Sequence, residues 1–117
     1  AEEITKNNKV IDVVFAVNYG GRAEIVDAVN EILAKGEKKV TEKSFASHLY
    51  NSDIPDLDLI VRSSGEKRLS NFMLWQSAYA ELDFEPELWP ECGRKVLWRA
   101  INAYCRRSRR FGGVESA

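Results

Sequence analysis

The stretch "DLIVRSSGEKRLSN", Asp58 to Asn71, joins the end of an apolar strand to a dense polar loop. Leu59, Ile60 and Val61 form a continuous apolar run, which is typical of a strand that is buried on both faces of a parallel sheet. Ligands of open parallel sheets bind beyond the carboxyl ends of the strands. The polar residues that follow this run are Arg62, Ser63, Ser64, Gly65, Glu66, Lys67, Arg68, Ser70 and Asn71. The stretch therefore predicts a parallel sheet with an anion-binding loop past one strand.

A second apolar run, "KVIDVVFAVN" from Lys9 to Asn18, predicts another buried parallel strand. It leads through a glycine turn into "GRAEIVDAVNEILAKG", where apolar residues recur at helical spacing and Gly36 marks a stop. Two buried strands separated by helices imply right-handed crossovers. We therefore expect an α/β fold, a parallel β-sheet flanked by helices.

The remaining elements follow from shorter patterns. We expect a helix from Thr41, a strand over "PDLDLIVR", a short helix carrying Phe72 to Trp75, and an edge strand in "AYAELDF". The segment "EPELWP" predicts a turn that starts the last helix. The expected apolar face of that helix consists of Leu97, Ala100, Ile101, Tyr104 and Cys105.

Composition excludes several classes of function. The chain has 117 residues, 44% of them hydrophobic and 30% charged, with a formal net charge of −1. This describes a globular domain without a general attraction to nucleic acid or to an anionic membrane. Basic residues crowd only into the tail "CRRSRRFGG", which has no interleaved aromatic residues, so we expect no nucleic-acid partner.

The cysteines and the longest apolar runs suggest a compartment. Cys92 and Cys105 lie too far apart in sequence for a zinc motif and fit a reducing cytosol. The run from Val13 to Val17 is too short to span a bilayer. We expect a cytoplasmic protein with at most peripheral contact with a membrane.

Arg62 and Arg68 carry the chemistry of the polar loop. Each guanidinium group can bind phosphate oxygens in a bidentate manner, Ser70 adds a hydroxyl group, and Gly65 lets the backbone bend. A phosphate or diphosphate site is one interpretation. The other is an exposed loop whose arginines pair with Glu66 or Asp83. Neither a Walker motif nor a Gly-x-Gly-x-x-Gly turn is present, which disfavours those modes of nucleotide binding.

Two further residues have competing interpretations. Glu81 lies in an apolar stretch, where it can either pair with an arginine or, beside a diphosphate, bind magnesium. His48 is the only histidine and lies in the helix expected from Thr41, which favours a structural role.

Three stretches together resemble the C-terminal half of a cis-prenyltransferase of the undecaprenyl diphosphate synthase type. They are "VNYGGRAEI", "DLIVRSSGEKRLSNFMLWQSAYAELDFEPELWP" and the closing "RRFGG". The resemblance implies condensation of isopentenyl diphosphate with an allylic prenyl diphosphate such as farnesyl diphosphate, with Mg²⁺ as cofactor and a homodimer as the assembly.

The resemblance also implies roles for single residues. The family's Arg-x-x-Gly-Glu-x-Arg-x-Ser pattern holds isopentenyl diphosphate, and the matched carboxylate helps to hold Mg²⁺. A terminal Arg-x-Gly element reaches the partner's site, and an Asn-Tyr-Gly-Gly-Arg-x-Glu turn shapes the floor. The matching residues are Arg62, Arg68 and Ser70 for the diphosphate, Glu81 for Mg²⁺, Arg110 and Gly112 for the terminal element, and Asn18, Gly20, Gly21, Arg22, Glu24 and Gly65 for the shape of the site.

The family's upstream phosphate loop, His-x-Asp-Gly-Asn-x-Arg-Trp, is absent from this sequence. We therefore expect residues 1–117 to be the C-terminal portion of a single catalytic domain, inactive in isolation because the allylic half of the site is missing. The alternative is a non-catalytic accessory subunit of a cis-prenyltransferase complex. Retention of the site arginines favours descent from a catalytic chain.

Overall fold

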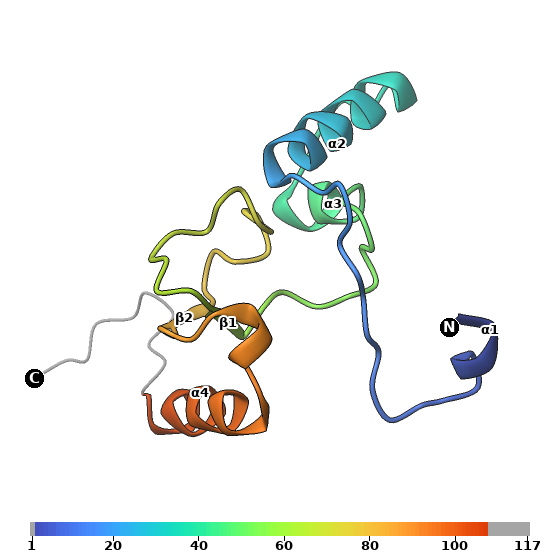
Figure 1. The fold of residues 1–117 in the computed structure, drawn as a ribbon. Coiled ribbons are helices and arrows are strands. Elements are labelled where there is room, and N and C mark those ends of the chain that lie inside the picture. The colour runs from blue at the N-terminus through green and yellow to red at the C-terminus, as the bar shows by residue number, and fades with distance from the viewer. Residues whose placement is uncertain (1, 108–117) are drawn as a thin grey trace, which may run out of the picture.

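A computed structural model describes residues 2–107 of the chain (Figure 1). Its elements form two groups, joined by residues 47–58, which lead from α3 to β1. One group contains α2 and α3, the other contains the sheet and α4, and α1 lies apart at the end of an extended segment. The elements are α1 (Glu2–Thr5), α2 (Gly21–Lys35), α3 (Glu42–Ala46), β1 (Leu59–Arg62), β2 (Glu81–Phe84), the 3₁₀ helix η1 (Trp89–Glu91) and α4 (Arg94–Arg106).

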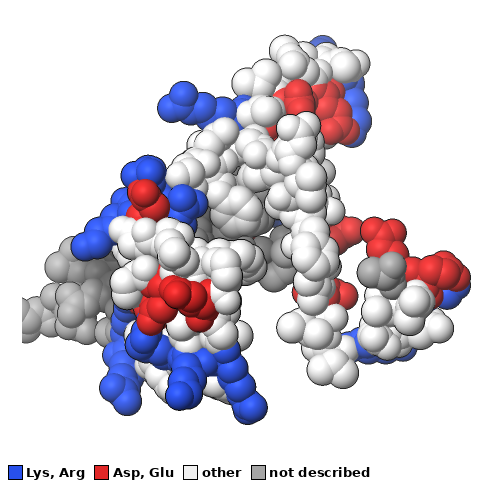
Figure 2. Space-filling model, viewed as in Figure 1, with Lys and Arg blue, Asp and Glu red and all other residues white. Residues whose placement is uncertain are grey.

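The sheet consists of β1 and β2, which run parallel. Leu59 pairs with Glu81 at one end and Arg62 pairs with Phe84 at the other. Helix α4 packs against this sheet through Val96 and Ala100, which are buried, whereas its lysine and arginine residues are exposed at the surface (Figure 2). The expected α/β class with a parallel sheet and flanking helices is confirmed. Glu81 lies at the amino end of its strand, whereas Arg62 lies at the carboxyl end of the neighbouring one.

Helix α2 forms where its sequence predicted it. Ala28 and Ile32 are buried, and the helix ends at Gly36, whose φ of 68° is the left-handed conformation that glycine adopts at little cost. Helix α3 begins after Thr41, whose side chain accepts a hydrogen bond from the backbone N–H of Ser44. Local capping chemistry thus sets both boundaries.

Residues 9–18 are extended but form no strand, contrary to the expectation from their apolar run. Val10 is 97% exposed and Phe15 is 82% exposed. A strand needs a hydrogen-bonding neighbour, and residues 2–107 place none beside this segment. The radius of gyration is 17.1 Å, against about 13–14 Å for a compact domain of this size. The described chain is therefore an open arrangement.

Two other expectations were wrong. Residues 72–75 form turns and no helix, because Ser70, Asn71 and Met73 have positive φ angles of 50°, 64° and 44°. On α4 the buried stripe is rotated from the expected face, since Leu97 and Cys105 are exposed.

Within residues 2–107, no helix combines the length and the apolar character that crossing a bilayer requires.

Candidate functional site

The arginine loop, residues 62–70, begins at the carboxyl end of β1 and turns back on the chain that follows β2. The backbone N–H of Ser64 donates to the carbonyl oxygen of Glu87 (2.7 Å), and that of Gly65 donates to Glu85 (2.8 Å). Ser64 and Gly65 have φ angles of 68° and 65°. A side chain at Gly65 would have open space around it, so its backbone conformation is what favours glycine there.

The two arginines of this loop differ in their surroundings. Arg62 is half-buried, and no described residue forms an ion pair with its side chain. Arg68 is exposed and pairs with Glu66, as one of the two interpretations of the sequence anticipated. An exposed pair of this kind contributes about 0–1 kcal/mol, so an incoming anion can replace the carboxylate.

Asn71 connects the arginine loop to the start of α2. Its carbonyl oxygen accepts from the N–H of Gly21 (2.8 Å), and its Oδ1 accepts from the N–H of Arg22 (2.9 Å). A Cβ at Gly20 would lie 2.9 Å from Asn71 Nδ2, and one at Gly21 would lie 2.9 Å from Leu74 Cγ. The glycine pair therefore permits a close approach that larger residues would block.

Sequence reasoning placed Asn71 in the polar loop but assigned it no role. The signal available was its place directly after Ser70, combined with the tolerance of asparagine for left-handed backbone. Nothing local indicated that its partners lie almost fifty residues upstream.

Glu24 is the centre of a buried hydrogen-bond network, with 1% of the residue exposed. Its carboxylate accepts from the hydroxyl of Tyr19 (2.5 Å), the N–H of Tyr50 (3.0 Å) and Nε2 of Gln76 (3.1 Å). Burial and the hydrogen bond to Glu24 raise the pKa of the Tyr19 hydroxyl. Because these partners come from three segments, Glu24 fixes the turn after residue 18 to the rest of the molecule. Asn18, at the start of that turn, is exposed with a φ of 53°.

A cavity of about 680 Å³ lies beside this network. Residues 12–19 form one wall, residues 49–57 form another, and Glu24 and Gln76 also line it. The arginine loop and Glu81 do not contribute to its lining. The cavity and the candidate anion site are therefore separate features of the described chain.

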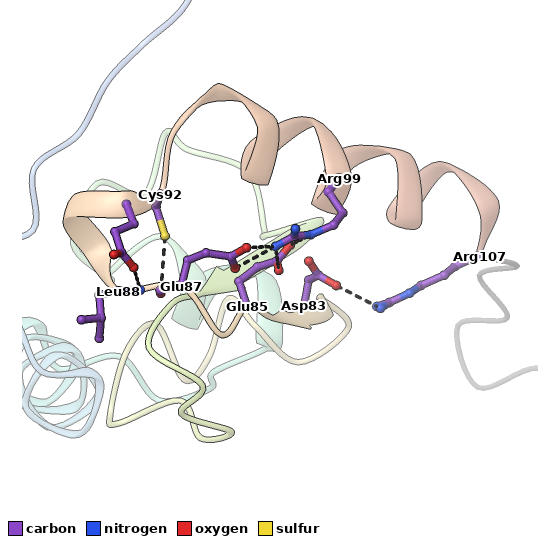
Figure 3. Close-up of polar contacts among 8 residues, drawn as sticks. Asp83, Glu85, Glu87, Leu88, Cys92, Arg99 and Arg107 are labelled. Carbon is purple, nitrogen blue, oxygen red and sulfur yellow. Dashed lines mark hydrogen bonds and ion pairs between the residues drawn. The ribbon is translucent and has the colours of Figure 1, made fainter.

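Glu81 faces the C-terminal end of α4. Its Oε2 lies 2.9 Å from Nη1 of Arg107, which also donates to the carbonyl oxygen of Leu82 (2.9 Å). Nη2 of the same guanidinium lies 3.5 Å from Oδ1 of Asp83, the contact drawn in Figure 3. The arginine-pair interpretation of Glu81 is thus realised in this structure.

The acidic residues that continue from β2 also face α4. Figure 3 shows Arg99 reaching from the helix toward Glu85 and Glu87, with Asp83 beside them. Burial and the neighbouring charge of Glu85 raise the pKa of the Asp83 carboxyl group. Arg99 lowers the pKa of Glu87 through its hydrogen bond. Every second residue from position 81 to position 87 is therefore a carboxylate that faces α4. Arg107 contacts the first two of these carboxylates and Arg99 contacts the last two.

The carboxylates around Glu81 can be compared with the ligands that a magnesium ion requires. Within residues 2–107 no group of three or more His, Cys, Asp or Glu side chains could enclose a metal. Mg²⁺ often binds only one or two carboxylates and takes its other ligands from substrate phosphates and water. The carboxylate of Glu81, which is only partly buried, fits that mode. It lies three residues from the Arg62 end of the sheet, or about 10 Å along the strands.

Of the remaining residues that the sequence singled out, some lie outside the described part of the chain and others lie within it. Arg110 and Gly112 lie outside the described residues. His48 is buried between two carboxylates, with Nε2 2.9 Å from Glu37 and Nδ1 3.4 Å from Glu31. These contacts tie α2 to the turn after α3, as a structural histidine would. Arg22 is exposed at the first turn of α2.

A parallel sheet with an arginine-rich loop at the carboxyl end of one strand defines an α/β protein suited to binding phosphate esters. The family model described as putative undecaprenyl diphosphate synthase matches residues 1–112. The chain belongs to this family, the cis-prenyltransferases.

Individual relatives agree with this assignment. The chain is 63% identical over 121 aligned residues to an isoprenyl transferase from Bifidobacterium longum, covering 98% of this chain and 46% of the relative. It is 52% identical to decaprenyl diphosphate synthase from Mycobacterium tuberculosis, covering 97% and 40% of the two chains. The chain thus spans less than half the length of these curated relatives.

Solved structures of the same fold are also similar. Lavandulyl diphosphate synthase from Lavandula x intermedia, solved in complex with dimethylallyl diphosphate, has a TM-score of 0.90 and 39% identity over 95% of this chain and 50% of that one. A probable undecaprenyl diphosphate synthase from Campylobacter jejuni has a TM-score of 0.81 and 36% identity, over 95% and 52%.

Proposed function

We propose that this chain is the C-terminal portion of a cis-prenyltransferase catalytic domain and supplies its isopentenyl diphosphate site and dimer surface. The whole protein would condense isopentenyl diphosphate with an allylic prenyl diphosphate to make a polyprenyl diphosphate. The observation that carries this proposal is the arginine loop at the carboxyl end of β1, in a chain that matches the family model over residues 1–112.

The chemistry divides between two diphosphates. The allylic carbon–oxygen bond breaks, and the double bond of isopentenyl diphosphate forms a new carbon–carbon bond at that carbon. A proton is then lost, which leaves a cis double bond. Arg62, Arg68 and Ser70 would hold the diphosphate that stays attached to its own carbon chain. Their role is to bind and orient, because charge-assisted contacts fix the acceptor in place.

Glu81 would hold Mg²⁺ together with diphosphate oxygens. When bound, the ion neutralises phosphate charge. Arg107 forms an ion pair with Glu81, and this ion pair would have to break before the carboxylate could bind the ion. Glu24, Gly20 and Gly21 would keep the floor of the site in shape, with Asn18 and Arg22 at its edge and Gly65 providing the bend in the arginine loop.

Three observations support the proposal that residues 1–117 are part of a longer catalytic domain. The chain spans 40–46% of the curated relatives described above. The apolar residues of 10–17 are exposed, and the radius of gyration exceeds that of a compact domain. The exposed apolar residues and the large radius of gyration are what a parallel sheet without its neighbouring strands would show.

The proposal includes partners and a location. Arg110 and Gly112 would reach the diphosphate site of a second copy in a homodimer, and the protein would work in the cytoplasm with at most peripheral contact with a membrane. No role in binding nucleic acid is proposed. The competing proposal, a non-catalytic accessory subunit, is disfavoured because Arg62, Arg68, Ser70 and Glu81 are all present.

The test joins this chain to the upstream half of the Bifidobacterium longum isoprenyl transferase. With farnesyl diphosphate, labelled isopentenyl diphosphate and Mg²⁺, this chimaera should form an extended, butanol-extractable lipid. The 117-residue chain alone should form none. A chimaera that carries Arg62→Ala and Arg68→Ala is the matched control and should be inactive. An active chain alone would contradict the half-site proposal, and a folded but inactive chimaera would favour the accessory subunit.

A further inference from the structure

The turn between the arginine loop and the segment after it has an unusual backbone. Ser70 and Asn71 follow one another with φ angles of 50° and 64°. Non-glycine residues rarely occupy this left-handed region, and two in succession persist only when other contacts hold them there. The contacts in this case are the two hydrogen bonds that Asn71 accepts from the backbone N–H groups at the start of α2.

Helix α2 in turn depends on Asn71. Its N-cap is Gly20, which has no side chain to accept a hydrogen bond from the first turn. The free backbone N–H groups of a first helical turn usually donate hydrogen bonds to the side chain of a Ser, Thr, Asp or Asn at the N-cap position. In this chain Asn71 satisfies the N–H groups of Gly21 and Arg22 from 49 residues beyond Arg22. The helix start and the arginine loop therefore stabilise each other.

We propose that Asn71 is a positioning residue for diphosphate binding, which holds Ser70 and the end of the arginine loop in place by capping α2. The identity of the ligand rests on the proposed function, whereas the positioning rests on the geometry alone. Asn71 acts through its neighbours and need not touch the ligand.

A pair of variants separates positioning from simple capping. Asn71→Ala removes the Oδ1 acceptor. In that background Gly20→Ser supplies a local cap, because Gly20 has extended backbone (φ −152°, ψ 121°) and the Asn71 amide that would meet its Cβ at 2.9 Å is gone. The double variant restores the helix cap without restoring the side-chain hydrogen bond between position 71 and Arg22; the backbone carbonyl of position 71, which accepts from Gly21, is the same in all variants.

Asn51→Ala is the matched control. Asn51 also has a left-handed backbone, with a φ of 50°, and it is exposed in a different loop. Its only hydrogen bond among residues 2–107 is from the N–H of Ile54 to its carbonyl oxygen, which alanine keeps.

Three measurements on the full 117-residue chain make the test. They are thermal unfolding by circular dichroism, the rate of tryptic cleavage after Lys67 and Arg68 followed by mass spectrometry, and binding of inorganic pyrophosphate by calorimetry. Asn71→Ala should lower the melting temperature, speed cleavage about fivefold or more, and weaken pyrophosphate binding about tenfold. The double variant should recover the melting temperature but neither of the other two properties. Asn51→Ala should leave cleavage and pyrophosphate binding unchanged.

The outcomes are distinguishable. Unchanged cleavage in Asn71→Ala would overturn the positioning role, whatever the ligand is. Recovery of all three properties in the double variant would also overturn it, because capping alone would then suffice. If cleavage responds as expected but the unmodified chain does not bind pyrophosphate, the positioning role stands and the proposed function fails.

Discussion

Arg99 of α4 binds Glu85, the carboxylate that directly follows β2. Nε of Arg99 lies 3.0 Å from Oε1 of Glu85, and its Nη2 contacts both Glu85 and Glu87. The carbonyl oxygens of the same two glutamates accept from the backbone of Ser64 and Gly65. The guanidinium of Arg99 therefore secures, on one short segment, both the helix and the beginning of the arginine loop.

Arg99→Ala should destabilise the chain. Glu85 is 5% exposed, and a buried carboxylate that loses its partner is costly. The cost falls below that of a fully buried pair because 52% of the Arg99 side chain is exposed. Urea unfolding measures the change. Arg94→Ala, at an exposed position on the same helix, should change stability by less than about 0.5 kcal/mol. Equal effects of the two variants would contradict the assigned role.

Arg68→Ala in the active chimaera should raise the Michaelis constant for isopentenyl diphosphate about ten- to a hundredfold. One charge-assisted contact contributes about 1.5–3 kcal/mol, and the allylic substrate should be much less affected. Arg68→Lys should recover only part of the loss, because a lysine cannot bind two oxygens in the same plane. Steady-state kinetics with each substrate varied in turn gives both constants.

Lys67→Ala is the control for this experiment, since Lys67 is the exposed neighbour of Arg68. It removes a positive charge from the same loop without removing a proposed ligand. Equal damage to both substrates by Arg68→Ala would mean that the wrong diphosphate has been assigned to the arginine loop.

Glu81→Gln should shift the magnesium dependence of the chimaera to higher concentration while leaving the fold intact. Glutamine keeps the size of the side chain but loses the charge that a hard cation requires. Calorimetric titration of Mg²⁺ with pyrophosphate present, beside an activity titration, checks this. Glu42→Gln, in the first turn of α3, should have no effect. If Glu81→Gln leaves both titrations unchanged, Glu81 is only the structural partner of Arg107.

Asp83→Asn should stabilise the chain at neutral pH. Burial and the charge of Glu85 raise the pKa of Asp83 in the folded state above its unfolded value, so ionisation of this group lowers stability as pH rises through that window. Asparagine removes the ionisation. The gain in melting temperature should therefore shrink as pH falls through the raised pKa of Asp83, where this carboxyl group becomes protonated. A gain that is independent of pH would contradict this cause.

Local chemistry explains which elements the sequence predicted. The span of α2 followed from its periodicity and from Gly36, and the start of α3 followed from the helical pattern that begins at Thr41. The structure shows that both boundaries depend on capping by residues within a few positions. The strand that ends at Arg62 was also predictable from its apolar run. Residues 9–18 gave an equally strong strand pattern, but a strand also needs a neighbour, which no local pattern can supply.

The candidate site shows the same division. Arg62 and Arg68 could be singled out from side-chain chemistry and from their place after a strand. The pairing of Glu81 with Arg107 and the capping of α2 by Asn71 join residues 26 and 49 positions apart. Such contacts depend on how the chain returns on itself, and that path is set by tertiary packing.

The extended segment from Val10 to Val17 has a consequence for handling the chain. Lys9 and Asp12 are the only charged residues within residues 9–18. This extended segment of apolar side chains therefore has few charges that would prevent it from pairing, as a β-strand, with the same segment of another copy. Concentrated solutions should therefore self-associate through intermolecular β-structure, without prior global unfolding. In the chimaera, the upstream half would then increase the solubility of the chain in addition to supplying catalytic groups.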